Sequence, residues 1–299
     1  MFELDTPVAP PPAVSFTSSR ELYPEAGGEG LPLIRIATSL CRAVVAPQGA
    51  QLLEFEPAGG TPLLWLSPRC QFTPGKALRG GIPICLPWFG PHPSDSSKPQ
   101  HGFARTSDWH LTQVSQGDDG RCELRFELRH QPDDRCSQAF TAELRMVLGN
   151  SIDLELSVTN RDERDFTCTW ALHSYFPVPS QAEVTVPVLA GRDYLDNLES
   201  HARKHQDGPL TFSGEVDRVF PAIEAPVVIE GQPRIRIDQE QSPSVVAWNP
   251  GPEKAANMAD VGPGNQEGFI CIERGAVLDE GWHLAPGEKR SGRLVIKAI

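Results

Sequence analysis

The sequence has no long hydrophobic segment and no targeting signal. No stretch approaches the roughly 18 consecutive apolar residues that indicate a membrane-spanning helix. The N-terminal residues MFELDTPVAPPP lack both the basic start and the apolar middle of a secretory signal. We therefore expect a protein that has no membrane partner.

Cysteine motifs are also absent. The chain has 7 cysteines, an odd number, and no two of them are spaced as Cys-x-x-Cys. Several, including Cys85, Cys168 and Cys271, lie inside apolar stretches, as the reduced cysteines of a protein core do. This pattern argues against a disulfide framework and against a structural zinc site, and it predicts a cytoplasmic location.

None of the short motifs that mark common catalytic centres is present. The chain has no Gly-x-Ser-x-Gly turn, no phosphate-binding P-loop, no Gly-x-Gly-x-x-Gly and no His-Glu-x-x-His. Among the 8 histidines, only His201 and His205 are spaced as metal ligands often are. Arg203 and Lys204 lie between them, and their positive charges disfavour a bound cation. We therefore expect no metal and no cofactor.

Positive charge is in deficit. The 27 lysines and arginines are outnumbered by 39 acidic residues, which gives a formal net charge of −12. Nucleic-acid binding needs a basic face, so we expect no nucleic-acid partner. An anionic small molecule would feel little long-range attraction to such a chain. A local cluster of arginines would have to hold it.

The chain is rich in turn residues and in period-two alternation. Its 29 prolines and 26 glycines indicate many turns and few long helices. From Cys122 onward, apolar and charged residues alternate as they do in half-buried antiparallel strands. The pair Gly149-Asn150 separates two such segments and is typical of a tight hairpin. The predicted strands cover residues 33–36, 50–55, 122–128, 142–148, 152–158, 166–172, 227–229, 234–237, 245–248, 269–272 and 294–299.

These strands predict an all-β fold, a large antiparallel β-sandwich of two sheets. Only residues 252–259 have the composition of a short helix. The proline cluster near the N-terminus predicts a flexible lead-in over residues 1–30. No linker or repeat divides the remainder, so residues 31–299 are expected to form a single domain. No long apolar face requires a partner subunit, and we expect a monomer.

Two loop segments combine an arginine with glycines or with a histidine. In the segment RGGIP, which begins at Arg79, the paired glycines let the backbone approach a ligand closely. In the segment HGFAR, His101 can donate a hydrogen bond to a sugar hydroxyl, and Arg105 can bind a phosphate through its planar fork. An ordinary surface turn explains either segment equally well when it is considered alone.

Two other positions are candidates for acid–base chemistry. His173 follows the apolar face of residues 166–172 with the opposite parity, which suits the lining of a cavity better than a core. Glu273 ends a segment that is apolar on both parities, as a strand buried on both faces is. Such burial raises the pKa of a carboxyl towards a useful range. The alternatives are an exposed histidine and a surface turn made by Glu273 and Arg274.

Two polar residues follow aromatic ones near strand ends. Asp196 comes after Tyr194, and its carboxylate could bind sugar hydroxyls. Asn249 comes after Trp248, where an aromatic face and an amide would together suit a sugar. Considered alone, each residue is better explained by a purely structural role.

Together these segments resemble the hexose-6-phosphate mutarotase family, also called glucose-6-phosphate 1-epimerases, within the galactose mutarotase-like superfamily. They occur in the family's order. The matching segments are RGGIP from Arg79, QHGFAR from Gln100, LHSYF from Leu172, YLD from Tyr194, WNP from Trp248 and CIE from Cys271.

The resemblance implies a β-supersandwich whose open face binds the sugar. It implies that Glu273 and His173 are the catalytic residues and that His101 and Asp196 contact the sugar. It further implies that Arg79 and Arg105 bind the 6-phosphate. The expected substrate is therefore a sugar phosphate, with D-glucose 6-phosphate as the leading candidate.

The implied chemistry is ring opening and closure. The Glu273 carboxylate takes the proton of the anomeric hydroxyl, while protonated His173 gives a proton to the ring oxygen. Rotation about the C1–C2 bond and reclosure give the other anomer. A general acid and a general base, each worth roughly 10²–10⁴-fold, need no cofactor for this reaction. We expect the two side chains to face one cavity, with room for a pyranose ring between them.

Two other functions are compatible with the sequence. An aldose 1-epimerase would act on unphosphorylated sugar, but it would have no use for Arg79 and Arg105 as phosphate ligands. A non-catalytic carbohydrate-binding or sensing module would need aromatic platforms and hydrogen bonds, but no pair made of Glu273 and His173.

Overall fold

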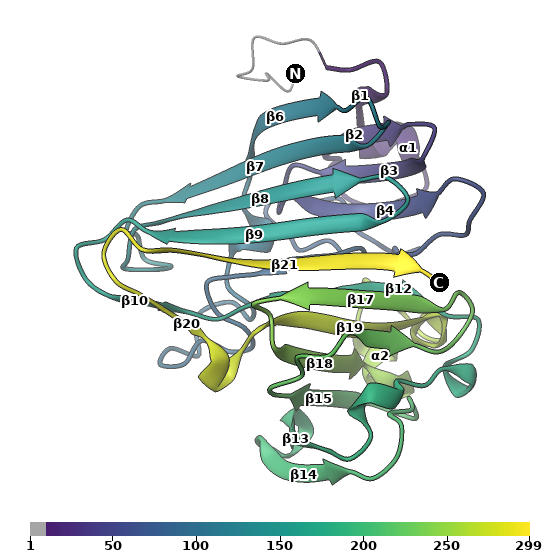
Figure 1. The fold of residues 1–299 in the computed structure, drawn as a ribbon, viewed down its shortest axis with the longest axis vertical. Coiled ribbons are helices and arrows are strands. Elements are labelled where there is room, and N and C mark those ends of the chain that lie inside the picture. The colour runs from purple at the N-terminus through teal and green to yellow at the C-terminus, as the bar shows by residue number, and fades with distance from the viewer. Residues whose placement is uncertain (1–9) are drawn as a thin grey trace.

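The computed structural model describes residues 10–299, and the strands of this part lie in four sheets. Figure 1 shows the seven-stranded sheet across the front of the molecule, the four-stranded sheet behind its upper part, and the eight-stranded sheet behind and below. All pairs of named strands are antiparallel, as the alternating sequence predicted. The molecule is therefore an antiparallel sandwich of several sheets.

The seven-stranded sheet contains the longest strands of the molecule. Its central hairpin joins β8 to β9 through the predicted Gly149-Asn150 turn, and Leu148 pairs with Ile152. In spatial order the strands are β16 (Val227–Ile229), β17 (Ile235–Glu240), β21 (Lys289–Ala298), β9 (Ile152–Asn160), β8 (Phe140–Leu148), β7 (Cys122–His130) and β6 (His110–Gln116).

The eight-stranded sheet carries the candidate site. In spatial order its strands are β14 (Ala202–Gln206), β13 (Arg192–Asp196), β15 (Val216–Phe220), β18 (Ser244–Asn249), β19 (Phe269–Ala276), β11 (Trp170–Leu172) and β5 (Ile84–Cys85), and β12 (Tyr175–Pro177) pairs with β19. The predicted strand over 166–172 is interrupted at Thr169. Its first part, β10 (Phe166–Cys168), pairs instead with β20 (Trp282–Leu284).

The four-stranded sheet corrects the prediction of a flexible N-terminal lead-in. Its strands are β1 (Val14–Ser18), β2 (Pro32–Ala37), β3 (Cys41–Ala46) and β4 (Gln51–Pro57). β1 lies inside the predicted lead-in but pairs with β2 over its whole length, and buried Val14 joins the main core. The apolar–polar alternation of VSFTS and its pairing with β2 favour a strand, in spite of the prolines that precede it. Residues 1–9 of the predicted lead-in lie outside the described part.

Helices are few and short, as the proline and glycine content predicted. α2 (Gly251–Asn257) confirms the helix expected near residues 252–259. α1 (Ser19–Leu22) was not predicted. Six 3₁₀ helices complete the described chain: Ala104–Thr106, Gln181–Glu183, Pro187–Leu189, Asn197–Glu199, Asn265–Gly268 and Leu278–Glu280. No described helix has the length and hydrophobicity to cross a membrane.

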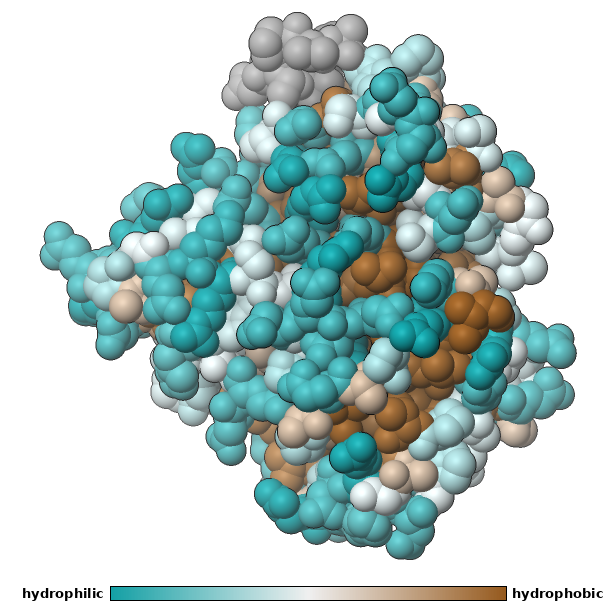
Figure 2. All heavy atoms as spheres, viewed as in Figure 1, coloured by the Kyte–Doolittle hydropathy of each residue, from teal (hydrophilic) through white to brown (hydrophobic). Residues whose placement is uncertain are grey.

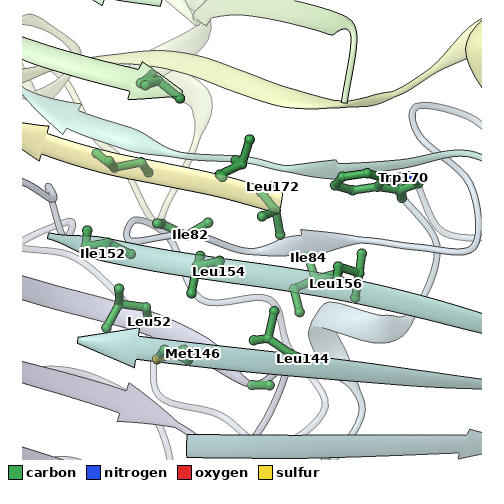
Figure 3. Packing of buried hydrophobic residues seen from close by; sticks show 14 of the residues in the cluster. Leu52, Ile82, Ile84, Leu144, Met146, Ile152, Leu154, Leu156, Trp170 and Leu172 are labelled. Carbon is green, nitrogen blue, oxygen red and sulfur yellow. The ribbon is translucent and has the colours of Figure 1, made fainter. Parts of the chain in front are cut away.

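The main core lies between the sheets. Figure 3 shows Leu154 and Leu156 of β9 in the same buried cluster as Leu52 of β4 and Leu172 of β11. All four side chains are essentially inaccessible to solvent. Each buried side chain of this kind stabilises the fold by about 1.5–3 kcal/mol, so this contact fixes the relative position of the layers.

The outer face of the seven-stranded sheet is charged. Arg145 bonds to Glu123, and Arg293 bonds to Asp153 at 2.8 Å. Figure 2 shows hydrophilic side chains over most of this face. Exposed pairs of this kind contribute only about 0–1 kcal/mol each, so they keep the face in contact with solvent rather than hold the sheets together.

The seven cysteines are all free and buried, as predicted for reduced core residues. Among residues 10–299 there is no group of three or more histidine, cysteine or acidic side chains that could hold a metal ion.

Candidate active site

The outer face of the eight-stranded sheet presents Glu273. The side chain of Glu273 in β19 lies beside that of Val246 in β18, and Val246 lies beside Val219 in β15, because paired residues point to the same face. Ile270 and Ile272 have the opposite parity and belong to the main core. One face of β19 therefore packs into the core, and its other face carries the Glu273 carboxylate.

His173 reaches the same face from the end of β11. Its backbone N–H donates to the carbonyl of Pro83 at 2.9 Å, which anchors the residue just after the strand. Its Nε2 lies 3.4 Å from Glu273 Oε1, and both side chains are buried. The expectation of a pyranose-sized space between the two is thus wrong. The two groups adjoin, so a sugar would lie over the pair.

Each member of this pair keeps a buried polar atom without a hydrogen-bond partner among the described residues. These atoms are Nδ1 of His173 and Oε2 of Glu273. An unsatisfied buried polar group costs about 1–3 kcal/mol, and stable folds rarely leave two of them side by side. The arrangement indicates a site that is completed by a ligand.

Burial shifts both pKa values towards neutral side chains. It raises the pKa of Glu273 well above the usual carboxyl value; the nearby Asp217 adds to this rise, and Arg105 opposes it. Burial also lowers the pKa of His173, and the positive charges of Arg105 and Arg79 act in the same direction. Burial therefore favours the uncharged form of both side chains.

His101 lies next to the pair. Its ring centroid is 6.0 Å from that of His173, and its Nδ1 accepts a hydrogen bond from the Gly90 N–H at 3.2 Å. Burial, together with the charges of Arg105 and Arg79, lowers its pKa to about 3. His101 is therefore neutral, with its proton on Nε2, and it can donate one hydrogen bond to a ligand.

Arg79 is held by two acceptors. Its Nε donates to Asp260 Oδ2 at 3.0 Å, and its Nη1 donates to the hydroxyl of Tyr175 at 2.8 Å. The Tyr175 ring stacks on the His173 ring, with centroids 4.8 Å apart and planes within 11°. Arg79 is therefore joined to His173 through one aromatic ring.

Arg105 lies in the 3₁₀ helix Ala104–Thr106. Its Nη2 donates to the carbonyl of Gln100 at 2.9 Å, and no carboxylate in the described chain pairs with it. The charges of Arg105 and Arg79 both lower the pKa of His101 and of His173. The charges of the two arginines therefore act on the same two histidines.

Two of the predicted sugar-binding residues already bond to other groups of the protein. Asp196 shares the parity of Tyr194, which packs in the main core, and its carboxylate binds Lys204 Nζ at 2.9 Å. It therefore points away from the Glu273 face. The amide of Asn249 donates to the carbonyls of Gln266 and Phe269 and accepts from the Gly251 N–H. These bonds occupy the amide in holding backbone, so Asn249 is structural.

Asp217 is the acidic residue that the sequence interpretation missed. It pairs with Trp248 in the β15–β18 register, which places its side chain on the Glu273 face. Asn197 Nδ2 donates to its Oδ1 at 2.6 Å. Burial raises the pKa of Asp217, and the bond from Asn197 opposes this rise. The signal in the sequence was an aspartate inside the strand-like run VDRVF, because aspartate is depleted in strands.

The fold and the site together define a class: an antiparallel β-sandwich that presents a glutamate–histidine pair on one open sheet face. Residues 32–297 match the model of the aldose 1-epimerase family, and the chain belongs to this family.

Two relatives and one solved structure give a more specific comparison than the family model does. A candidate glucose-6-phosphate 1-epimerase from Cenchrus ciliaris is 35% identical over 273 residues, which cover 87% of this chain and 82% of the relative. One of the same name from Salmonella typhimurium is 36% identical over 82% of this chain and 83% of its own length. The crystal structure of a candidate mutarotase from Salmonella typhimurium superposes with a TM-score of 0.82 at 33% identity, and covers 89% of this chain and 90% of its own.

Proposed function

We propose that this protein interconverts the α and β anomers of a hexose 6-phosphate, with D-glucose 6-phosphate as the substrate. The observation that carries the proposal is the contact between Glu273 and His173 at 3.4 Å, on a sheet face that two arginines also reach. The names of the relatives support the same activity.

The geometry of the pair suits the two oxygens that exchange protons. The anomeric hydroxyl oxygen and the ring oxygen are bonded to the same carbon atom of the sugar. An acid and a base that adjoin can therefore reach one oxygen each. Transfer of a proton from Glu273 to its neighbour His173 gives a carboxylate and an imidazolium. The Glu273 carboxylate then removes the hydroxyl proton while His173 protonates the ring oxygen, and the ring opens to the aldehyde.

The protonation states of Glu273 and His173 after ring opening are those that ring closure requires. Ring opening leaves Glu273 protonated and His173 neutral, which are the states that burial favours in the free protein. After rotation about C1–C2, Glu273 returns its proton to the carbonyl oxygen, and His173 takes the proton from the hydroxyl that re-forms the ring. The pair holds one proton in total throughout, so no charge has to enter or leave the buried site.

Substrate binding falls to the surrounding polar groups. His101 Nε2–H donates to a sugar hydroxyl, and Asp217 accepts from another. Arg79 and Arg105 bind the phosphate through charge-assisted hydrogen bonds, which are about twice as strong as neutral ones. All these groups come from one chain.

The phosphate assignment separates this proposal from an aldose 1-epimerase. We expect wild-type protein to speed anomer exchange of glucose 6-phosphate far more than that of glucose, and Arg105→Ala to lower kcat/KM for the phosphate ester by about 100-fold. That loss corresponds to a charge-assisted contact of about 2.7 kcal/mol.

The measurement is anomer exchange followed by a coupled assay that consumes one anomer. Activity on free glucose should change less than threefold in Arg105→Ala. Equal losses on both substrates would remove the phosphate assignment. A wild-type protein that binds sugar phosphate without turnover would instead show a binding module.

A further inference from the structure

We propose that Asp260 is a positioning residue, which holds Arg79 in the orientation that receives the phosphate of the substrate. The inference rests on the proposed function, because it takes Arg79 as a phosphate ligand. Asp260 lies between α2 and the 3₁₀ helix Asn265–Gly268, far in sequence from Arg79, and no motif pointed to it.

Two bonds on neighbouring edges fix the plane of the guanidinium. Asp260 Oδ2 takes the Nε–H, and the Tyr175 hydroxyl takes an Nη1–H. Within residues 10–299, Nη2 donates to no acceptor. The side chains of Arg79 and Asp260 are only 20% and 27% exposed, so the pair is largely shielded from water. A planar fork held at two nitrogens presents the third in one direction.

Ser67 fixes both members of the ion pair. Its backbone N–H donates to the Arg79 carbonyl at 3.0 Å, and its hydroxyl donates to the Asp260 carbonyl at 2.6 Å. Ser67 is buried. One residue therefore sets the distance between the two backbones, so the Nε–Oδ2 bond forms before any ligand arrives.

The segment that carries Asp260 is itself closed by local hydrogen bonds. The backbone N–H groups of Val261 and Gly262 both donate to the Met258 carbonyl, at 3.0 and 2.7 Å, and Asn265 Nδ2 donates to the Val261 carbonyl at 2.7 Å. These bonds make the segment a rigid support for the carboxylate. A support of this kind reduces the conformational entropy that Arg79 would lose when it binds phosphate.

This arrangement predicts that loss of Asp260 weakens binding of the sugar phosphate and leaves the chemical step unchanged. The phosphate is attached at C6 and keeps the same contacts while the bonds at C1 change. Loss of a preorganised phosphate ligand therefore raises KM and leaves kcat nearly unchanged. Free glucose makes no contact through a phosphate, so its kcat/KM should not respond.

The test compares three variants in the anomer-exchange assay. We expect Asp260→Ala to raise KM for glucose 6-phosphate about tenfold, with kcat and the activity on glucose within twofold of wild type. Asp260→Asn keeps an oxygen that can accept the Nε–H, so we expect its KM to stay within threefold of wild type. Asp153→Ala removes a different carboxylate, bonded to Arg293 at 2.8 Å on the seven-stranded sheet, and should change none of these values.

Protection against thermal unfolding supplies a readout independent of turnover. Glucose 6-phosphate at a fixed concentration should raise the Tm of wild type and Asp260→Asn by similar amounts, and that of Asp260→Ala by less. A wild-type KM in Asp260→Ala would overturn the proposal. So would equal losses on both substrates, or an Asp260→Asn variant as impaired as Asp260→Ala.

The failure of this proposal can be distinguished from failure of the proposed function. If wild type does not turn over glucose 6-phosphate, the function itself is wrong. If wild type is active and Arg79→Ala has a normal KM, Arg79 is not a phosphate ligand and Asp260 has nothing to position. If Arg79→Ala is impaired and Asp260→Ala is not, only the positioning role is overturned.

Discussion

Glu273 and Arg274 are consecutive residues of β19, and both are buried, with exposures of 1% and 0%. Their side chains point to opposite faces of the same sheet. Arg274 donates from Nη1 to the Ile223 carbonyl and from Nη2 to the Ala225 carbonyl, and its Nε has no partner among the described residues. Among the described residues, the Glu273 carboxylate has one ion-pair partner, the titratable side chain of His173.

The two faces of β19 therefore use a buried ionisable side chain in different ways. On the inner side, a buried cation ties the loop over residues 223–225 to the sandwich through carbonyls that cannot titrate. Burial lowers the pKa of Arg274 to about 10, so it stays charged at neutral pH. On the outer side, burial raises the pKa of the Glu273 carboxyl and so favours its protonated form. Burial of Arg274 ties down backbone, and burial of Glu273 shifts the pKa of the side chain to which the proposed function assigns proton transfer.

The largest expected effect is on kcat, from a substitution that replaces the ionisable carboxyl of Glu273. Glu273→Gln keeps the shape of the side chain but cannot exchange a proton, so kcat for anomer exchange should fall about 10³-fold. The spontaneous rate, subtracted from each trace, is the baseline. Fully retained turnover in this variant would mean that the acid–base role lies elsewhere on the sheet face.

Arg274→Met should affect stability instead. It leaves at least two buried carbonyls without their charged donor, and such hydrogen bonds contribute about 1.5–3 kcal/mol each. We expect the free energy of unfolding, measured with urea, to fall by about 3 kcal/mol. The folded protein at low temperature should keep kcat within about threefold of wild type. A variant as stable as wild type but inactive would place Arg274 in the catalytic machinery and contradict its structural role.

The smallest effect should be a pH-dependent gain in stability for Glu273→Gln. The pKa of Glu273 is higher in the folded protein than in the unfolded chain, so its contribution to stability is full below pH of about 4. That contribution is lost as the pH rises through the folded pKa. Glutamine does not titrate and avoids this loss.

We therefore expect the variant to unfold about 2–4 °C above wild type near pH 8, a difference of about 1 kcal/mol, and the gap to close towards pH 4. Thermal melts at both pH values measure it. The Asp153→Ala variant serves as a control whose Tm offset should not follow this trend. A Tm difference that grows towards acid would show that the sign of the pKa shift is wrong.

The sequence predicted the fold through local pattern. Alternation over residues 122–158 is a property of neighbouring residues, and so is the Gly149-Asn150 turn between two of these strands. Strand β1 was missed, because its five residues become a strand only by pairing with β2. Its proline-rich surroundings signal flexibility to any local reading of the sequence.

The sequence also determined the identity of the two central side chains. The parity of His173 and the apolar setting of Glu273 are visible in the order of residues alone. Which acidic residue joins them was decided by tertiary structure. Asp196 and Asp217 both lie in strands of one sheet, but the register turns the first towards Lys204 and the second towards the Glu273 face.

The distances within the site belong wholly to the tertiary structure. The 3.4 Å contact of the pair joins residues 100 positions apart, and the bond from Arg79 to Asp260 joins residues 181 positions apart. No local pattern encodes such contacts, because they depend on how whole sheets pack. The same packing excludes water, and that exclusion sets the pKa shifts on which the proposed chemistry depends.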